Sequence, residues 1–230
     1  MLILALDTST SAIGVAVLAP GAEPVVRVDV DARAHAEKLA PLVRDALAAA
    51  GATPAQLTGI AVGTGPGPFT GLRVGLVTAL TLGAALGIPV HGVCSLDALA
   101  AQALAEHVHL AQVLVATDAR RKEVYWAPYS RWAAGAEGAE EASVVAALAE
   151  PAVSRPDDVP DDVRALPTAG RGQLLYPDVF RNPLGTPLDV DPGWLGRVAL
   201  HRLATGQPTP VAPLYLRRPD ALTTAERGVP

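Results

Sequence analysis

The residues best suited to chemistry lie just after the first apolar run of the chain. Asp7 is followed directly by Thr8, Ser9 and Thr10, and a carboxylate beside hydroxyls can hold the water shell of Mg²⁺ and the phosphates of a nucleotide. The same residue types favour an Asx-turn, in which the carboxylate accepts a hydrogen bond from the backbone two residues on. We favour the turn, and we keep Asp7, Thr8 and Ser9 as the candidate nucleotide-binding residues.

A second candidate site is the glycine- and proline-rich segment of residues 63–75. A glycine-rich loop that opens a helix can bind an anion through free backbone N–H groups and the helix dipole. This segment lacks the Lys-Ser/Thr pair of a P-loop and the GxGxxG spacing of a dinucleotide fold. Pro66 and Pro68 also remove N–H donors that a phosphate would use. We favour a shaped turn, with phosphate binding as the alternative.

The sequence contains no spacing typical of a hydrolase or a metal enzyme. The GxSxG and HExxH patterns are both missing. His35 is followed four residues on by Leu39, where a helical metal pair would need a second histidine. Cys94 is the single cysteine, so an internal disulfide is impossible, and we interpret it as a small buried hydrophobe. We expect no catalytic residue and no metal site.

The net charge of −5 at pH 7 argues against independent binding of nucleic acid. A protein that grips RNA or DNA alone usually presents a basic face, whereas the largest basic clusters here are Arg120-Arg121-Lys122 and Arg217-Arg218. The N-terminus has no basic start and reaches Asp7 after a short apolar run, which is unlike a signal peptide. We expect a cytoplasmic protein without a membrane anchor.

The elements that position these residues follow from the spacing of the apolar positions. In the first half of the chain the order β-β-β-α-β-α-β-α is that of an RNase H-like domain, the half-unit of actin-like proteins. The pattern predicts strands over residues 2–6, 13–18, 25–30, 59–62 and 90–94. It predicts helices over residues 34–50, 71–86 and 96–105.

The ends of the second and third helices have recognisable signals. Thr70 suits the N-cap of the second helix, with Phe69 and Val74 in the two positions of a hydrophobic staple. Gly87 suits its left-handed C-terminal position. Ser95 suits the N-cap of the third helix.

Small residues recur at every fourth position along the second helix. Four residues advance about 400°, so successive members drift only about 40° around the axis and form a shallow groove that another helix could approach closely. The members are Gly67, Gly71, Gly75, Ala79, Gly83 and Gly87.

The same helix has no charged residue between Arg73 and His91. A helix that is apolar all round is buried, spans a membrane or meets a partner. Its length of about 16 residues falls short of the roughly 20 needed for a span, and it is closed by caps. Packing within the monomer and a protein interface both remain open.

The second half of the chain begins as the first half does. A strand over residues 114–118 ends in Asp118, as the first strand ends in Asp7, and a returning strand follows over residues 124–129. This internal repeat lies where a duplicated fold would place it.

Beyond this repeat the signal weakens. Residues 133–141 have the composition of an Ala/Gly/Glu linker, and residues 151–167 that of a Pro/Asp-rich loop. We predict an N-terminal RNase H-like unit with partner-binding helices over residues 1–106 and a reduced C-terminal RNase H-like unit over residues 107–230.

Five segments of the chain resemble the motifs of the TsaB (YeaZ) family in their order. They are residues 4–9, 35–41, 65–75, 118–125 and 213–217. Residues 130–211 match only in outline, and Pro68 stands where the family commonly has Ser. The resemblance implies an α/β, actin-like (ASKHA) fold of two RNase H-like units, and a role in forming N6-threonylcarbamoyladenosine (t6A) in tRNA.

The resemblance also implies partners. It implies a non-catalytic subunit that supports a TsaD-like transferase together with a TsaE-like ATPase and reaches tRNA only through that complex. ATP or ADP could bind at the partner interface, and a homodimer could use the same helices. The catalytic relative holds its metal with two histidines four residues apart, and Leu39 replaces the second one here.

The resemblance favours a protein interface on the first two helices. The candidate partner-binding residues are His35, Leu39, Leu42, Val43, Phe69, Gly71, Leu72, Arg73, Gly75, Leu76, Ala79, Leu80 and Arg120. On this hypothesis a large charged residue at Gly75 or Ala79 abolishes pairing and leaves the monomer folded.

Three other functions remain as alternatives. The first is an actin-like small-molecule kinase or ATPase that uses Asp7 and the glycine-rich loop. The second is a peptidase M22-like protease, against which the loss of the metal pair at Leu39 argues. The third is a homodimeric scaffold that uses the same apolar face.

Overall fold

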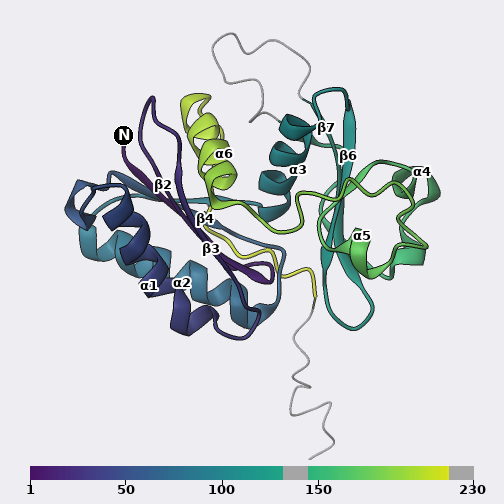
Figure 1. The fold of residues 1–230 in the computed structure, drawn as a ribbon, viewed down its shortest axis with the longest axis horizontal. Coiled ribbons are helices and arrows are strands. Elements are labelled where there is room, and N and C mark those ends of the chain that lie inside the picture. The colour runs from purple at the N-terminus through teal and green to yellow at the C-terminus, as the bar shows by residue number, and fades with distance from the viewer. Residues whose placement is uncertain (132–144, 218–230) are drawn as a thin grey trace, which may run out of the picture.

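The computed structural model describes residues 1–131 and 145–217, and its backbone forms two five-stranded sheets with helices packed against them (Figure 1). The first sheet has the strand order β3-β2-β1-β4-β5. Its strands are β1 (Ile3–Asp7), β2 (Ala12–Leu18), β3 (Val25–Val30), β4 (Gly59–Gly63) and β5 (Val90–Val93). The first three strands pair antiparallel, and β4 and β5 continue the sheet in parallel from β1.

The two faces of the first sheet are covered by different helices. Helix α1 (His35–Ala49) follows β3, and α2 (Phe69–Leu86) connects β4 to β5; together they cover one face (Figure 1). Helices α3 (Ser95–Glu106) and α6 (Pro192–Ala204) lie on the other side. Leu4 and Leu6 point to the first pair of helices and Ile3 and Ala5 to the second, as the two-residue period of a strand requires. The predicted element order of the first half is confirmed.

The second sheet has the order β10-β6-β7-β8, and β9 also pairs with β7. Its strands are β6 (Gln112–Asp118), β7 (Val124–Arg131), β8 (Val145–Ala147), β9 (Ala152–Ser154) and β10 (Thr168–Ala169). The short helices of the molecule are η1 (Pro54–Gln56), η3 (Pro156–Asp158), α4 (Asp161–Arg164) and α5 (Gly172–Leu175). The expectation of a plain loop over residues 151–167 is wrong, because this segment contains β9, η3 and α4. The expected linker at residues 133–141 lies outside the described residues.

A buried polar group on α3 joins the two halves of the molecule. Asp97 accepts a hydrogen bond from the hydroxyl of Tyr129 on β7 at 2.7 Å and one from the guanidinium of Arg202 on α6 at 2.5 Å. Helix α6 lies in the second half of the sequence, but it packs on the first sheet and on α3. The division at residues 106 and 107 stays a prediction.

The ends of two helices differ from the prediction. Helix α2 begins at Phe69 with Pro68 in the N-cap position and no side-chain cap, so Thr70 is not its cap. The predicted staple is also wrong, because the ring of Phe69 is half exposed and lies against Tyr215 instead of Val74. Helix α3 begins at Ser95 itself, without a side-chain cap. Gly87 has the expected left-handed conformation, with φ of 66°.

Candidate functional site

The Asp7-Thr8-Ser9 turn at the end of β1 is buried. The three residues are 1%, 2% and 3% exposed. Oδ1 of Asp7 accepts hydrogen bonds from the backbone N–H and the hydroxyl of Ser9, both at 2.8 Å, as in an Asx-turn. Its Oδ2 accepts from the hydroxyl of Ser95 at 2.7 Å, which explains why Ser95 does not cap α3. Both carboxylate oxygens of Asp7 therefore accept hydrogen bonds from groups of the chain itself.

Burial raises the pKa of Asp7 above its ordinary value of 3.8, while the bonds from Ser95 and Ser9 oppose the shift. The folded protein thus holds the proton of the Asp7 carboxyl group more tightly than the unfolded chain does. The contribution of Asp7 to the free energy of unfolding therefore falls as the pH rises from 3.8 through the raised pKa of the folded state. Asp7→Asn has no such proton. We expect the stability of this variant relative to the natural chain to increase with pH across this window.

Urea unfolding of the two proteins over a pH series measures this difference. Asp45→Asn, the same chemical change on the exposed side of α1, is measured alongside as the control for the substitution itself. A difference between Asp7→Asn and the natural chain that stays constant with pH would contradict the assignment.

Thr8 links the same turn to α2. Its hydroxyl donates to the carbonyl of Gly71 at 2.8 Å and accepts from the N–H of Gly75 at 3.0 Å. A Cβ built at Gly75 would lie 2.5 Å from Oγ1 of Thr8, and one at Gly71 would lie 2.9 Å from its carbonyl oxygen. The glycines of α2 therefore admit the chain's own β1–β2 turn at close range.

The other small residues at every fourth position of this segment also lie close to atoms of the chain itself. A Cβ at Gly67 would lie 2.5 Å from the carbonyl oxygen of Ser9, and one at Gly83 would collide with the side chain of Val90. Ala79 is fully buried. The hypothesis that a large charged residue at Gly75 or Ala79 leaves the monomer folded is therefore contradicted, because both positions face the chain's own interior.

The structure divides the candidate partner-binding residues into two groups. Those buried in the single chain are His35, Leu39, Gly71, Leu72, Gly75, Leu76 and Ala79. Those at least partly exposed are Leu42, Val43, Phe69, Arg73, Leu80 and Arg120. Val77, which is 57% exposed on α2, was missed. Its position one turn after Arg73 and opposite the small residues was the available signal.

An apolar groove separates the exposed edges of α1 and α2, with a volume of about 440 Å³. Its lining residues are Ala40, Val43, Arg44, Leu47, Ala48, Ala52, Thr53, Pro54, Thr78 and Leu82. Val77 and Leu80, the latter 48% exposed, lie on the solvent-exposed side of α2. We call the groove with these two residues the α1–α2 face. Exposed apolar surface of this kind typically marks an interaction site.

In length and hydropathy α2 could cross a membrane: it has 18 residues, a mean hydropathy of 1.5, and a third of the span is buried. Core helices of other proteins have the same properties. Here the buried side of α2 packs on the first sheet, and its exposed side forms the α1–α2 face.

An aromatic pair lies at the N-terminal end of this face. The rings of Phe69 and Tyr215 are 50% and 45% exposed, and their centroids are 5.3 Å apart. The guanidinium carbon of Arg73 lies 4.9 Å from the centre of the Phe69 ring. The C-terminal segment that carries Tyr215 is held by the N–H of Leu214, which donates to the carbonyl of Thr64 at 2.8 Å. Tyr215 is therefore fixed beside α2.

A small cleft lies between the β1–β2 turn and the second half of the molecule. Its lining residues are Ser9, Thr10, Ser11, Pro68, Thr117, Asp118, Arg120, Arg171, Leu188 and Asp189. The space amounts to about 10 Å³, or room for about one water. Two of the lining residues, Arg171 and Asp189, form a two-pronged ion pair at 2.6 to 3.0 Å. This cleft therefore has no open space of nucleotide size in the structure.

The described parts of the chain contain no group of side chains suited to a metal ion and no reactive thiol. Within residues 1–131 and 145–217, no three His, Cys, Asp or Glu side chains are grouped to hold a metal ion. Burial raises the pKa of the Cys94 thiol well above its ordinary value, which disfavours the reactive thiolate.

The chain is similar to several known proteins in sequence and in structure. Residues 29–154 match the family model of TsaD, the tRNA N6-adenosine threonylcarbamoyltransferase. A Mycobacterium leprae protein of unassigned function is 43% identical over 96% of this chain, and the chain spans 56% of that protein's length. TsaB from Escherichia coli, a tRNA threonylcarbamoyladenosine biosynthesis protein, is 34% identical over 78% of this chain and 75% of its own length.

The solved structure of YeaZ from Pseudomonas aeruginosa has the same fold. It superposes on this chain with a TM-score of 0.78 at 32% sequence identity and covers 94% of this chain and 99% of its own. The predicted actin-like α/β fold is thereby confirmed.

Proposed function

The chain belongs to the TsaB (YeaZ) family, and from this premise we propose that it is a non-catalytic subunit required for t6A formation, which binds and supports a TsaD-like transferase together with a TsaE-like ATPase. The observation that carries the proposal is the α1–α2 face. Its apolar groove and the exposed Val77 and Leu80 present to solvent a surface that a partner would cover.

The transferase is a suitable occupant of this face because it is expected to contain related helices. The stretch that matches the TsaD model, residues 29–154, includes both α1 and α2. Two related helix pairs can pack against each other with similar surfaces in contact, as in an isologous interface. The same argument supports a homodimer as the second candidate, since a second copy presents the same helices.

Two groups of residues serve this interface in different ways. We propose that Leu42, Val43, Phe69, Arg73 and Leu80 contact the partner directly, with Val77 added. The buried members of the candidate set support these residues from below by fixing α1 and α2 on the sheet.

Arg120 lies apart from the α1–α2 face, on the cleft and in an ion pair with Asp118 at 3.0 Å. Its contact with a partner stays a proposal of its own. Any ATP or ADP would sit where a partner completes the site, because the chain's own cleft holds only about one water.

The test is reconstitution with the transferase and ATPase of the same organism. We expect the chain and the TsaD-like protein to co-elute in size-exclusion chromatography. We also expect threonylcarbamoyl transfer to be lost when the chain is omitted, with the ATPase and the threonylcarbamoyl-adenylate supplied. Separate elution together with undiminished transfer would contradict the proposal. A homodimer that persists in the presence of the transferase would favour the scaffold alternative.

A further inference from the structure

The turn between β6 and β7 has an unusual backbone. Arg120, Arg121 and Lys122 are consecutive and have φ values of 63°, 54° and 62°. The left-handed conformation costs a non-glycine residue roughly 1–2 kcal/mol. Such strain persists only where the surroundings enforce it, and it concentrates at functional sites. All three strained residues here are basic.

Neighbouring groups hold this turn in place. The N–H of Arg120 donates to Oδ1 of Asp118 at 2.7 Å, and the N–H of Glu123 donates to the carbonyl of Arg120 at 3.0 Å. From the C-terminal segment, Arg217 donates to the carbonyl of Ala119 at 2.9 Å and forms an ion pair with Glu123. The turn is therefore preformed, and its basic side chains are carried on a rigid base.

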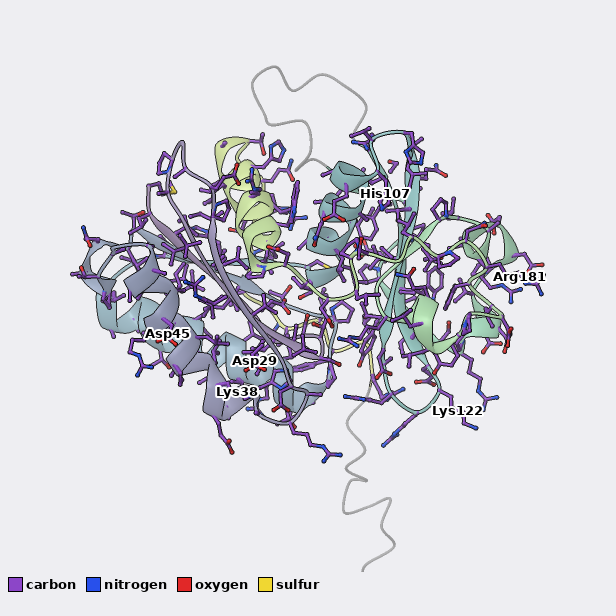
Figure 2. All side chains as sticks on the ribbon, viewed as in Figure 1. Asp29, Lys38, Asp45, His107, Lys122 and Arg181 are labelled. Atoms are coloured by element: carbon purple, nitrogen blue, oxygen red, sulfur yellow. The ribbon has the colours of Figure 1, made fainter. Side chains whose placement is uncertain are left out.

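The charge of the turn has the opposite sign to that of the whole chain. Within the described residues, the turn and Arg217 carry four cationic side chains, those of Arg120, Arg121, Lys122 and Arg217, and two carboxylates, those of Asp118 and Glu123. The chain as a whole carries −5. Arg121 and Lys122 are exposed, and Figure 2 places Lys122 at the lower margin of the second half, far from Asp45 on α1. We call Arg121 and Lys122 the basic tip.

We propose that the basic tip binds phosphates of the tRNA held by the complex, an inference that rests on the proposed function. The basic tip offers exposed cations on a rigid turn, as phosphate contacts require. A protein interface usually adds buried aromatic or apolar anchors to its arginines, and exposed anchors of that kind are found at the α1–α2 face. One or two phosphate contacts are too few for independent binding, so the contact forms only once the transferase holds the tRNA.

The experiment compares complexes of the transferase with two forms of this chain. One carries Arg121→Glu and Lys122→Glu. The control carries Arg155→Glu and Arg181→Glu, which make the same change of charge at exposed positions elsewhere; Figure 2 shows Arg181 at the outer edge of the second half. Size-exclusion chromatography first establishes complex formation. The dissociation constant for an unmodified tRNA transcript is then measured over a series of KCl concentrations.

We expect the basic-tip variant to form the complex and to bind tRNA about 10-fold or more weakly at low salt. Each lost phosphate contact lowers the slope of log Kd against log salt by about 0.7–0.9, so the slope should fall by about 1–2. The control should match the natural chain within about 2-fold.

Other outcomes would overturn the proposal in distinguishable ways. An unchanged slope and affinity would show that the basic tip does not touch tRNA. Loss of the transferase or the ATPase from the variant complex would make the tip a protein contact. Loss of ADP binding in calorimetry with tRNA binding intact would assign the phosphates to a nucleotide. If the natural chain forms no complex, the proposed function fails first and this inference with it.

Discussion

We expect Val77→Asp to weaken pairing with the transferase about 100-fold while the free chain stays folded. Val77 is 57% exposed on α2, so the carboxylate is solvated in the free protein and costs little stability. In the complex the same carboxylate would be buried against apolar surface without a partner, which costs several kcal/mol. A loss of about 3 kcal/mol corresponds to a roughly 100-fold weaker complex. Calorimetric titration of the variant with the transferase measures it.

The matched control is Leu174→Asp. Leu174 is 56% exposed on α5 in the second half of the molecule, so the chemical change and the exposure are nearly the same but the location differs. The control should bind the transferase as the natural chain does. Both variants should have the same midpoint urea concentration for unfolding as the natural chain, within error. Equal binding by Val77→Asp and the natural chain would move the interface away from the α1–α2 face.

Much of the first half of the fold could be predicted because its signals are local. The three opening strands, the two crossover helices and the left-handed Gly87 follow from period, composition and glycine chemistry. The predicted caps at Thr70 and Ser95 are absent, and for Ser95 a tertiary contact explains the difference. The hydroxyl of Ser95 bonds to Asp7, which lies 88 residues away, and no local pattern reveals that bond.

The candidate site shows the same limit. The four-residue period identified which positions of α2 share a side, but a period does not say which side faces the sheet. Gly71 and Gly75 therefore turned out to face Thr8, and the exposed Val77 was missed. The short strands β8 and β9 pair with β7 and have too few residues to show a period of their own.

A large side chain at Gly75 should destabilise the folded chain itself instead of only disrupting an interface. A Cβ there would lie 2.5 Å from Oγ1 of Thr8, inside the bonded arrangement of Thr8 with Gly71 and Gly75. Overpacking of a core costs about 1–3 kcal/mol, and a buried hydrogen bond adds about 1 kcal/mol. Against these stands the gain of roughly 1 kcal/mol when a helical glycine is replaced. We expect Gly75→Leu to lower the free energy of unfolding in urea by about 1–3 kcal/mol, and Ala85→Leu on the exposed side to leave it unchanged.

The role of the Thr8 hydroxyl can be isolated with smaller changes. Gly75→Ala places only a Cβ against Oγ1, and Thr8→Ala removes that oxygen. If the clash with the hydroxyl dominates, the double variant should be more stable than Gly75→Ala alone by about 1 kcal/mol, a coupling that a double-mutant cycle measures directly. Strict additivity of the two changes would show that the β1–β2 turn and α2 are independent. Coupling would show instead that the Asp7-Thr8-Ser9 turn holds in position the helix that bears the α1–α2 face.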